Sequence, residues 1–391
     1  MPFRRCLHRQ ARISSKVHRR KVHLRSGTCF IIKNILTGMK TIFAPWLAGF
    51  FLLACPVILP AQNDGAVAEP NIFSRLQQYS PLHVVIETDL KKLRQETKEE
   101  TWQTGVFKIM NGKTVAFEQA VQVATRGNMR KKTCDFPPLK IRFYHEKPEN
   151  DSLADINELK LVVSCRNSAN DDQLVMRECF AYALYNLFTD ESFRVKPATL
   201  EVKNPGRKKS SLKGTAFFIE SEKELAARLG GRPLKPRIIS PKIMDSTAYL
   251  RMCLFEFMIG NTDWGAYTRH NIKVIGIAGR SPVAIPYDFD YSGLVAADYA
   301  VPSPDIPIAS VAERYFLGLC VSDRTYSDAF SDFRAKKPKI LQLCKEYSGL
   351  DSGSRVHMRD YLNGFFDLLD DPAGVKKYII ENCNKRVKQD D

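Results

Sequence analysis

The segment Met258-Ile-Gly-Asn-Thr-Asp-Trp264 directly follows a strongly apolar stretch, and Pro286-Tyr-Asp-Phe-Asp290 ends a second one. The first apolar stretch predicts a buried helix, which would hold the loop containing Asp263 in a fixed place. The second predicts a short strand that delivers Asp288 to the edge of a cleft. Two carboxylates placed by rigid elements in this way are suited to bind a metal ion, which can in turn bind a phosphate.

Phosphoryl transfer needs a few groups that act together. One carboxylate orients the acceptor hydroxyl, an amide and a second carboxylate hold Mg²⁺ against the phosphates, and a cation fixes those phosphates. Taken singly, Asp263 and Asp288 are better explained as turn or cap residues. Their order, with a predicted hairpin at 271–287 between them, favours a site for a metal and a nucleotide.

Asn261-Thr-Asp-Trp264 followed by Asp288-Phe-Asp290 resembles the CotH (spore-coat protein H) kinase family, whose members are atypical protein-kinase-like enzymes. The resemblance implies one catalytic-loop residue, Asp263, and three metal ligands, Asn271, Asp288 and Asp290. In the family motif a His follows the Asp-Trp pair and the Asn lies five residues after the Asp. Here Gly265 replaces that His and Asn271 lies eight residues after the aspartate.

Two segments of the preceding half resemble the phosphate-binding parts of such kinases. Arg126-Gly127 follows a predicted strand and is similar to the family's phosphate loop, where Gly127 would let the backbone approach a phosphate and Arg126 would contact it. Leu139-Lys-Ile-Arg-Phe143 alternates strictly and predicts a strand, on which Lys140 resembles the phosphate-anchoring lysine. A plain turn and a solvent-facing basic stripe are the respective alternatives.

Two glutamates complete the kinase pattern. Glu178 lies in a helix predicted over 174–188, where the pattern needs a carboxylate to hold Lys140. Phe217-Phe-Ile-Glu220 resembles the hinge between kinase lobes, whose backbone would bind the adenine edge. A surface glutamate on an amphipathic helix and an ordinary apolar strand explain the same residues.

The pattern along the rest of the chain predicts an α+β protein with a two-lobed protein-kinase-like fold. Short strand-like runs dominate residues 80–220 and are interrupted by one helix, which predicts a β-rich N-lobe. Helical periodicity dominates residues 221–391, apart from the hairpin, and predicts a mainly helical C-lobe. Nucleotide would bind in the cleft between the lobes.

The first part of the chain has the layout of an export signal. Lys40 and the uncharged, largely apolar stretch 42–59 predict a signal peptide over 39–61. We interpret residues 1–38 as an upstream start extension and 62–79 as a linker. Leu-Ala-Cys55 also resembles a lipoprotein box, which would acylate Cys55, although the apolar residues after Cys55 favour a cleaved signal. We therefore expect an exported protein that is periplasmic, secreted or on the cell surface, with membrane contact only through the signal peptide or this lipid anchor.

The charge distribution argues against a nucleic-acid partner. The chain has 59 basic and 43 acidic residues and a formal net charge of +16. Eleven of the basic residues precede residue 62, so 48 basic residues face the 43 acidic ones in the remainder. A phosphate-coating surface needs clustered cations on the folded domain, and Arg207-Lys-Lys209 is only a short run.

Seven cysteines follow residue 61, so at least one thiol stays free in an exported protein. Cys134 and Cys165 both flank predicted strands, and a disulfide between them suits an oxidising compartment. Buried, reduced cysteines are the alternative. The cysteine spacing does not suggest a zinc site.

Together these patterns favour a kinase that binds ATP with Mg²⁺ or Mn²⁺ and phosphorylates a hydroxyl of a protein or cell-surface acceptor. The first alternative is a catalytically inactive binding protein of the cell envelope. The second is a metal-dependent phosphohydrolase that uses Asp263, Asp288 and Asp290. Sites of the latter kind usually recruit histidines, and His270 is the one histidine close to them in the sequence.

Overall fold

A computed structural model describes residues 71–95, 101–127, 130, 134–143, 158–166, 168–209 and 212–383. All of them belong to one unit, which spans Val67–Asp391. The predicted upstream extension, the signal peptide and Cys55 lie outside the described residues. Within the described part, no helix combines the length and the apolar character needed to cross a membrane.

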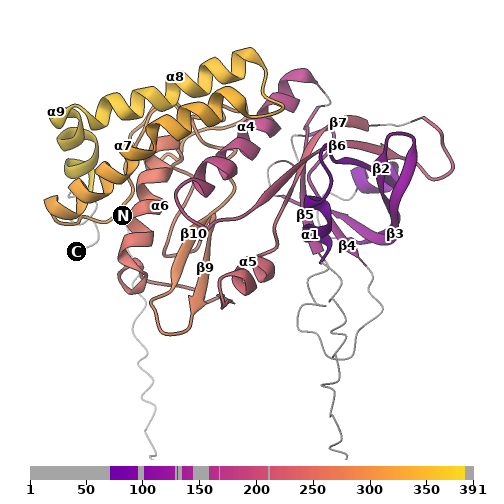
Figure 1. The fold of residues 1–391 in the computed structure, drawn as a ribbon, viewed down its shortest axis with the longest axis horizontal. Helices are drawn as coiled ribbons and strands as arrows, with labels where there is room; N and C mark the ends of the chain where they lie inside the picture. The colour runs from indigo at the N-terminus through magenta and orange to yellow at the C-terminus, as the bar shows by residue number, and fades with distance from the viewer. Residues whose placement is uncertain are drawn as a thin grey trace, which may run out of the picture. The chain divides into compact units, whose positions relative to one another are not determined.

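Seven strands of the described chain close into a barrel in the order β1-β2-β3-β4-β5-β7-β6 (Figure 1). Their bounds are β1 His83–Thr88, β2 Gln103–Asn111, β3 Thr114–Thr125, β4 Leu139–Phe143, β5 Glu158–Val163, β6 Val195–Lys203 and β7 Leu212–Ile219. Neighbouring strands are antiparallel except β1 and β6, which pair in parallel and close the sheet. Alternate side chains such as Phe107, Ile141 and Phe218 are fully buried in its core.

The bounds of the described helices are α1 Ile72–Gln77, α2 Leu90–Gln95, α4 Ala169–Asn186, α5 Glu222–Arg228, α6 Ser246–Ile259, α7 Asp323–Glu346, α8 Ser352–Leu369 and α9 Pro372–Val375. The helices from α4 onward gather on a second core that also includes Phe217 and Ile219 of β7, whereas α1 and α2 pack on the barrel core. Helix α4 contacts β5, β6 and β7, while α8 contacts α6, α7 and α9 (Figure 1). The described chain also contains a three-stranded antiparallel sheet, in the order β10-β9-β8, formed by β8 Gly231–Leu234, β9 Ile272–Ile277 and β10 Val283–Pro286.

Helix α6 is the apolar helix that the sequence predicted, and it is almost wholly enclosed. Eleven of its 14 residues are buried. The side chain of Asp245 caps its first turn, and Gly260 ends it in the left-handed region at φ 66°. Because neighbours hold the helix on nearly every side, the loop that begins at Asn261 starts from a fixed point.

The predicted two-lobed protein-kinase-like fold is wrong. The strand-rich half closes into a seven-stranded barrel, and β8 joins the predicted hairpin in a separate three-stranded sheet. The expectation of one helix among these strands is also wrong, because α1 and α2 flank β1, and α1 lies within the segment predicted as a linker. Local alternation identifies a strand but does not reveal its partners, so the pairing of β1 with β6 was not predictable from it.

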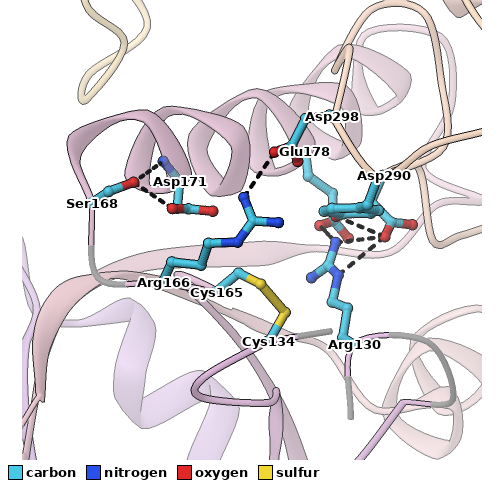
Figure 2. The surroundings of a disulfide bond; sticks show 10 residues. Arg130, Cys134, Cys165, Arg166, Ser168, Asp171, Glu178, Asp290 and Asp298 are labelled. Atoms are coloured by element: carbon cyan, nitrogen blue, oxygen red, sulfur yellow. Dashed lines mark hydrogen bonds and ion pairs between the residues drawn. A yellow bond between two sulfur atoms is a disulfide. The ribbon is translucent and has the colours of Figure 1, made fainter. Parts of the chain in front are cut away.

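Two disulfides link described segments that are distant in the sequence. One joins Cys134 to Cys165, as the sequence had suggested, and it lies beside Arg130 (Figure 2). The other joins Cys320 to Cys383 and was not predicted. Cys179, Cys253 and Cys344 are buried free thiols.

Candidate functional site

A polar cavity of about 240 Å³ brings together segments from both halves of the chain. It is lined by Arg126, Gly127, Arg130, Pro138, Asp263, Asn271, Asp288, Asp290 and Tyr291. Six of the nine predicted site residues are in this set. Arg126 and Gly127 come from the loop after β3, whereas Asp263 and Asp288 come from the segments after α6 and β10. The structure therefore brings cations and carboxylates from distant segments of the chain to one space.

The loop around Asp263 is fixed by its own hydrogen bonds. The Asp263 N–H donates to Asn261 Oδ1 at 3.1 Å, and Trp264 Nε1 donates to the Asn261 carbonyl at 3.2 Å. Main-chain hydrogen bonds in both directions join Gly265 and His270 at 3.0 and 2.9 Å. The residues between them form a closed turn, which returns the chain to Asp263 in spite of the long sequence spacing.

Asn271 and His270 both contact the Asp263 carboxylate. Asn271 Nδ2 donates to Oδ2 at 3.0 Å and to the Asp263 carbonyl at 2.8 Å. His270 Nε2 lies 2.9 Å from Oδ1. His270 was considered only as a histidine for the phosphohydrolase alternative, and the hydrogen-bonded pair that it forms with Asp263 was not predicted. Together these contacts fix the direction in which the carboxylate points.

A buried glutamate lies beneath this loop. Glu256 of α6 is fully buried, and within the described residues neither of its carboxyl oxygens has a hydrogen-bond partner. Burial raises the pKa of Glu256 well above its usual value, the Asn261 side chain lowers this pKa, and the charge of Asp263 raises it. Burial therefore favours the uncharged form of Glu256 beneath the Asp263 loop.

Asp288 occupies the end of β10 in an unusual backbone conformation. Its N–H donates to the Tyr182 hydroxyl of α4 at 2.9 Å. Its φ is 69°, and Asn271 has φ 49°. Residues other than glycine rarely adopt this left-handed backbone region, and Asp and Asn tolerate it best among them. Burial and the charge of Asp290 raise the pKa of Asp288, while Arg126, Arg130 and Lys160 lower it.

Arg130 forms a buried ion cluster with two predicted site residues (Figure 2). Its Nη2 lies 2.7 Å from Glu178 Oε2 and 2.8 Å from Asp290 Oδ2. The Tyr299 hydroxyl donates to the same Asp290 oxygen at 3.0 Å. Burial raises the pKa of Glu178 to about 7, against the lowering effect of Arg130. The predicted partner of Glu178 was Lys140, and the partner that the structure provides is Arg130.

Lys160, not the predicted Lys140, is the lysine whose charge contributes most to lowering the pKa of Asp288. Lys140 and Lys160 are paired in register on β4 and β5. Lys140 Nζ lies 3.9 Å from Glu158 Oε1. Burial lowers the pKa of Lys160 to about 7, with further lowering by the charges of Arg126 and Lys273, while Asp288 opposes this shift. The strict alternation around Lys160 was a signal equal to that around Lys140, and only the tertiary structure distinguishes them.

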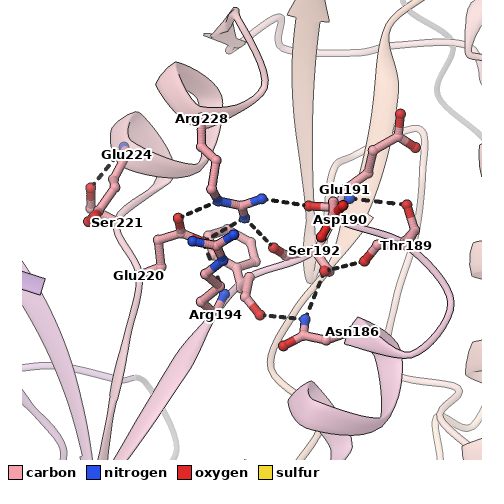
Figure 3. A network of polar contacts seen from close by, with 11 residues as sticks. Asn186, Thr189, Asp190, Glu191, Ser192, Arg194, Glu220, Ser221, Glu224 and Arg228 are labelled. Carbon is pink, nitrogen blue, oxygen red and sulfur yellow. Dashed lines mark hydrogen bonds and ion pairs between the residues drawn. The ribbon is translucent and has the colours of Figure 1, made fainter. Parts of the chain in front are cut away.

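Glu220 is engaged in a structural network away from the cavity (Figure 3). Both of its carboxylate oxygens accept hydrogen bonds from Arg228 at 2.9 Å, and the Arg194 N–H donates to one of them at 3.0 Å. Arg228 also donates to the Ser192 carbonyl at 2.7 Å. The side chain therefore joins the start of α5 to the loop before β6.

The cavity residues suit a magnesium ion that is bound partly by its substrate. Among the described residues, no group of three or more His, Cys, Asp or Glu side chains is placed to hold a metal. Mg²⁺ keeps several waters and needs only one or two carboxylates when phosphates supply other ligands. The oxygens of Asp288 and Asn271 fit this requirement. Asp290 fits it less well because one of its oxygens already accepts from Arg130 and Tyr299.

Comparison with known proteins adds little to this geometry. No protein-family model matches the chain, and no curated protein matches it. The CotH resemblance therefore rests on the quoted motifs alone. The chain is similar to a solved structure of the Helicobacter pylori proinflammatory kinase CtkA, with 11% identity and a TM-score of 0.31, over 64% of this chain and 94% of that one. A likeness this weak carries no argument about function.

Proposed function

We propose that this protein is a phosphotransferase that binds ATP with Mg²⁺ or Mn²⁺ in the polar cavity and phosphorylates a hydroxyl of a protein or cell-surface acceptor. The observation that carries the proposal is the composition of that cavity. Arg126 and Gly127 line it together with Asp263, Asn271 and Asp288. Phosphoryl transfer needs this combination of a cation, a close backbone approach, metal-binding oxygens and a carboxylate near the acceptor.

Each cavity residue has a distinct task in this proposal. Asp288 and Asn271 would hold the metal, which supplies positive charge against the phosphate oxygens. Arg126 and the backbone at Gly127 would bind the phosphates. Asp263, with its direction fixed by Asn271 and His270, would accept a hydrogen bond from the acceptor hydroxyl.

The charges around the cavity favour a strongly anionic ligand. Lys160 and Lys273 both lie over the ring of Tyr287, with Nζ 5.1 and 4.5 Å from its centroid. Burial lowers the pKa of both lysines, and their mutual repulsion contributes to the shift of Lys160. A triphosphate placed near them would offset this repulsion and favour the charged form of both groups.

Disulfides support the proposed export. Cys134–Cys165 and Cys320–Cys383 lie in the described part of the folded unit. Disulfides persist in oxidising compartments and are rare where thiol reductants are abundant. This agrees with the signal peptide expected over 39–61.

Labelled ATP tests the proposed activity directly. The purified protein is incubated with γ-labelled ATP and Mg²⁺, and incorporation into protein is compared between the wild type, Asp288→Asn and Asp328→Asn. Asp328 is exposed on α7, so its variant is a control for the same chemical change. We expect Asp288→Asn to lose incorporation and Asp328→Asn to keep it. Incorporation that survives in Asp288→Asn contradicts the assigned metal role.

A thermal-shift titration separates the rival functions. A nucleotide at a hundred times its dissociation constant stabilises a fold by about 2.7 kcal/mol. Stabilisation without phosphate transfer would favour the inactive binding protein, and the engagement of Asp290 by Arg130 is the observation that supports that rival. Phosphate release from a phosphodiester substrate without transfer from ATP would favour the phosphohydrolase.

A further inference from the structure

The segment that leads from β8 into α6 exposes a dense set of cations, and we call it the 232–243 surface. Arg232, Lys235, Arg237 and Lys242 are all exposed, and no acidic residue occurs in residues 231–244. In the part of the chain that the structure describes, no ion pair involves these four side chains. The neighbouring acid Asp245 is already paired with Arg280 at 2.8 Å. Within the described part of the chain, the positive charge of this surface is therefore not neutralised by acidic side chains.

Apolar groups accompany these cations. Ile238 is 68% exposed and Ile243 is 56% exposed, which is unusual for large aliphatic side chains. A hollow of about 230 Å³ lies at the same segment, and its lining includes Met244, Leu250 and Lys242. The hollow is mostly apolar and large enough for a side chain such as Leu or Phe.

The 232–243 surface is joined to the loop of the candidate catalytic residue. The Ile239 N–H donates to the Tyr267 carbonyl at 3.1 Å. Tyr267 lies in the closed turn between Gly265 and His270, and it is itself 48% exposed. A ligand that covers this surface would therefore pass beside the turn that fixes Asp263.

We propose that the 232–243 surface binds an acidic segment of the phosphate-accepting protein, with one apolar side chain of that segment in the hollow. Charge complementarity carries the choice of partner, because exposed and unpaired cations attract Asp and Glu side chains and steer their approach. The hollow provides an anchor of the kind that fixes a peptide in register. This inference rests on the proposed function, since it names the class of acceptor.

The hollow distinguishes a peptide from a membrane as the occupant. An anionic bilayer would also attract Arg237 and Lys242, and it would accept the protruding Ile243. However, a bilayer meets protruding side chains and does not fill a concave, side-chain-sized space. A polypeptide satisfies the cations, the exposed aliphatic groups and the hollow together.

Synthetic peptides test this inference. The probe is a set of fluorescent peptides with acidic residues around a central Leu or Phe, matched by peptides in which Lys replaces each acid. We expect the acidic set to bind the wild-type protein and the basic set not to bind. The double variant Arg237→Glu/Lys242→Glu should weaken binding of the acidic set by about tenfold or more, which corresponds to about 1.4 kcal/mol.

A matched control uses the other exposed basic run. Arg207→Glu/Lys208→Glu makes the same two residue changes outside the 232–243 surface, and its peptide affinity should equal that of the wild type. Thermal melts without ligand establish that both double variants are folded. A third variant, Ile243→Asp, should weaken binding of the same peptides without altering the ATP-dependent thermal shift.

Three results overturn the inference. These are equal affinity for acidic and basic peptides, equal loss in both double variants, and binding to vesicles of phosphatidylserine and phosphatidylcholine without binding to the acidic peptides. The proposed function fails separately, if ATP with Mg²⁺ gives no thermal shift in the wild type. Peptide binding that persists in that case would leave the surface assigned and the phosphotransferase proposal rejected.

Discussion

The side-chain amide of Asn271 donates to the carbonyl and to the carboxylate of Asp263, at 2.8 and 3.0 Å. The two residues are separated by a turn that Gly265 and His270 close with paired hydrogen bonds. The sequence spacing differs from that of the CotH motif, yet the turn absorbs the additional residues. The spacing alone is therefore no obstacle to the two side chains sharing a site.

This relationship predicts different effects for two substitutions of Asn271. Asn271→Ala removes both donors and places Ala at φ 49°, whereas Asn271→Gly removes the donors and accepts that φ without strain. We expect both variants to lose metal-dependent ATP binding. The free energy of unfolding in urea should fall by about 1–3 kcal/mol in the Ala variant and by less in the Gly variant. Equal stability of the two variants would contradict the argument about backbone conformation.

The lowered pKa of Lys160 predicts that the protein takes up a proton when it binds ATP. Its pKa is lowered to about 7, so a large fraction of the free protein carries a neutral Lys160 at pH 8. A bound triphosphate favours the charged form and raises this pKa. Affinity should therefore decline as pH rises from about 7 through the raised pKa. Titration calorimetry in buffers of different ionisation enthalpy measures the proton uptake.

The matched variants for this prediction come from the paired strands β4 and β5. Lys160→Met should abolish most of the affinity, and Lys160→Arg should keep the affinity but remove its pH dependence in this range. Lys140→Met is the control, because Lys140 lies opposite Lys160 in register and close to Glu158. An affinity loss as large in Lys140→Met as in Lys160→Met would refute the assignment of Lys160.

The raised pKa of Glu224 predicts that lowering the pH from about 7 to about 4.5 stabilises the fold. Burial raises its pKa from 4.5 to about 7, with a further contribution from the charge of Glu220. Between these values the folded state binds more protons than the unfolded state, so the free energy of unfolding falls as pH rises from about 4.5 to about 7. Glu224→Gln should remove this dependence and increase stability at pH 8, by an amount on the order of 1 to 3 kcal/mol. Urea unfolding at several pH values measures the effect.

The control for Glu224 is an exposed glutamate that undergoes the same substitution. Glu381→Gln, near the end of the described chain, should leave both the stability and its pH dependence unchanged. If Glu224→Gln instead lowers stability at pH 8, favourable interactions of the Glu224 carboxylate in the folded protein outweigh the cost of its burial.

The Cys134–Cys165 disulfide predicts a link between redox state and the cavity. Arg130, which lines the cavity, accepts a main-chain hydrogen bond from the Cys134 N–H at 3.0 Å. Cys134→Ser/Cys165→Ser frees this segment and should lower the free energy of unfolding by about 2–4 kcal/mol. It should also weaken ATP binding, because Arg130 is no longer held against Glu178 and Asp290.

The second disulfide provides the comparison for this prediction. Cys320→Ser/Cys383→Ser opens a longer loop of 63 residues and should also destabilise the fold. Neither cysteine lines the cavity, so ATP affinity measured well below the melting temperature should be unchanged. Equal loss of affinity in both double variants would indicate a general effect of stability.

Several site features were predictable from the sequence because they depend on local patterns. The apolar stretch before Gly260 predicted a buried helix, and α6 has that form. The alternation of Leu139–Phe143 predicted a strand, and β4 occupies the same residues. Six of the predicted site residues line one cavity, and each lies close to the end of a helix or strand whose bounds are encoded locally.

Other features depended on contacts between distant segments. Glu178 was expected to meet Lys140, yet Arg130 reaches it from a loop that no local pattern connects to α4. Glu220 was expected near a nucleotide, yet Arg228 holds both of its carboxylate oxygens. Side-chain alternation indicates which residues share a face of a strand. Strand pairing decides which of the two faces lies toward a given cavity.

The sequence by itself determined where the helix and strands that lead to Asp263 and Asp288 lie, because hydrophobic periodicity is a local property of the chain. Only the tertiary structure decided that β1 and β6 close a barrel, that Lys160 rather than Lys140 lies near Asp288, and that Arg130 pairs with Glu178. These outcomes depend on contacts between residues far apart in the chain, and such contacts leave no periodic signal in it.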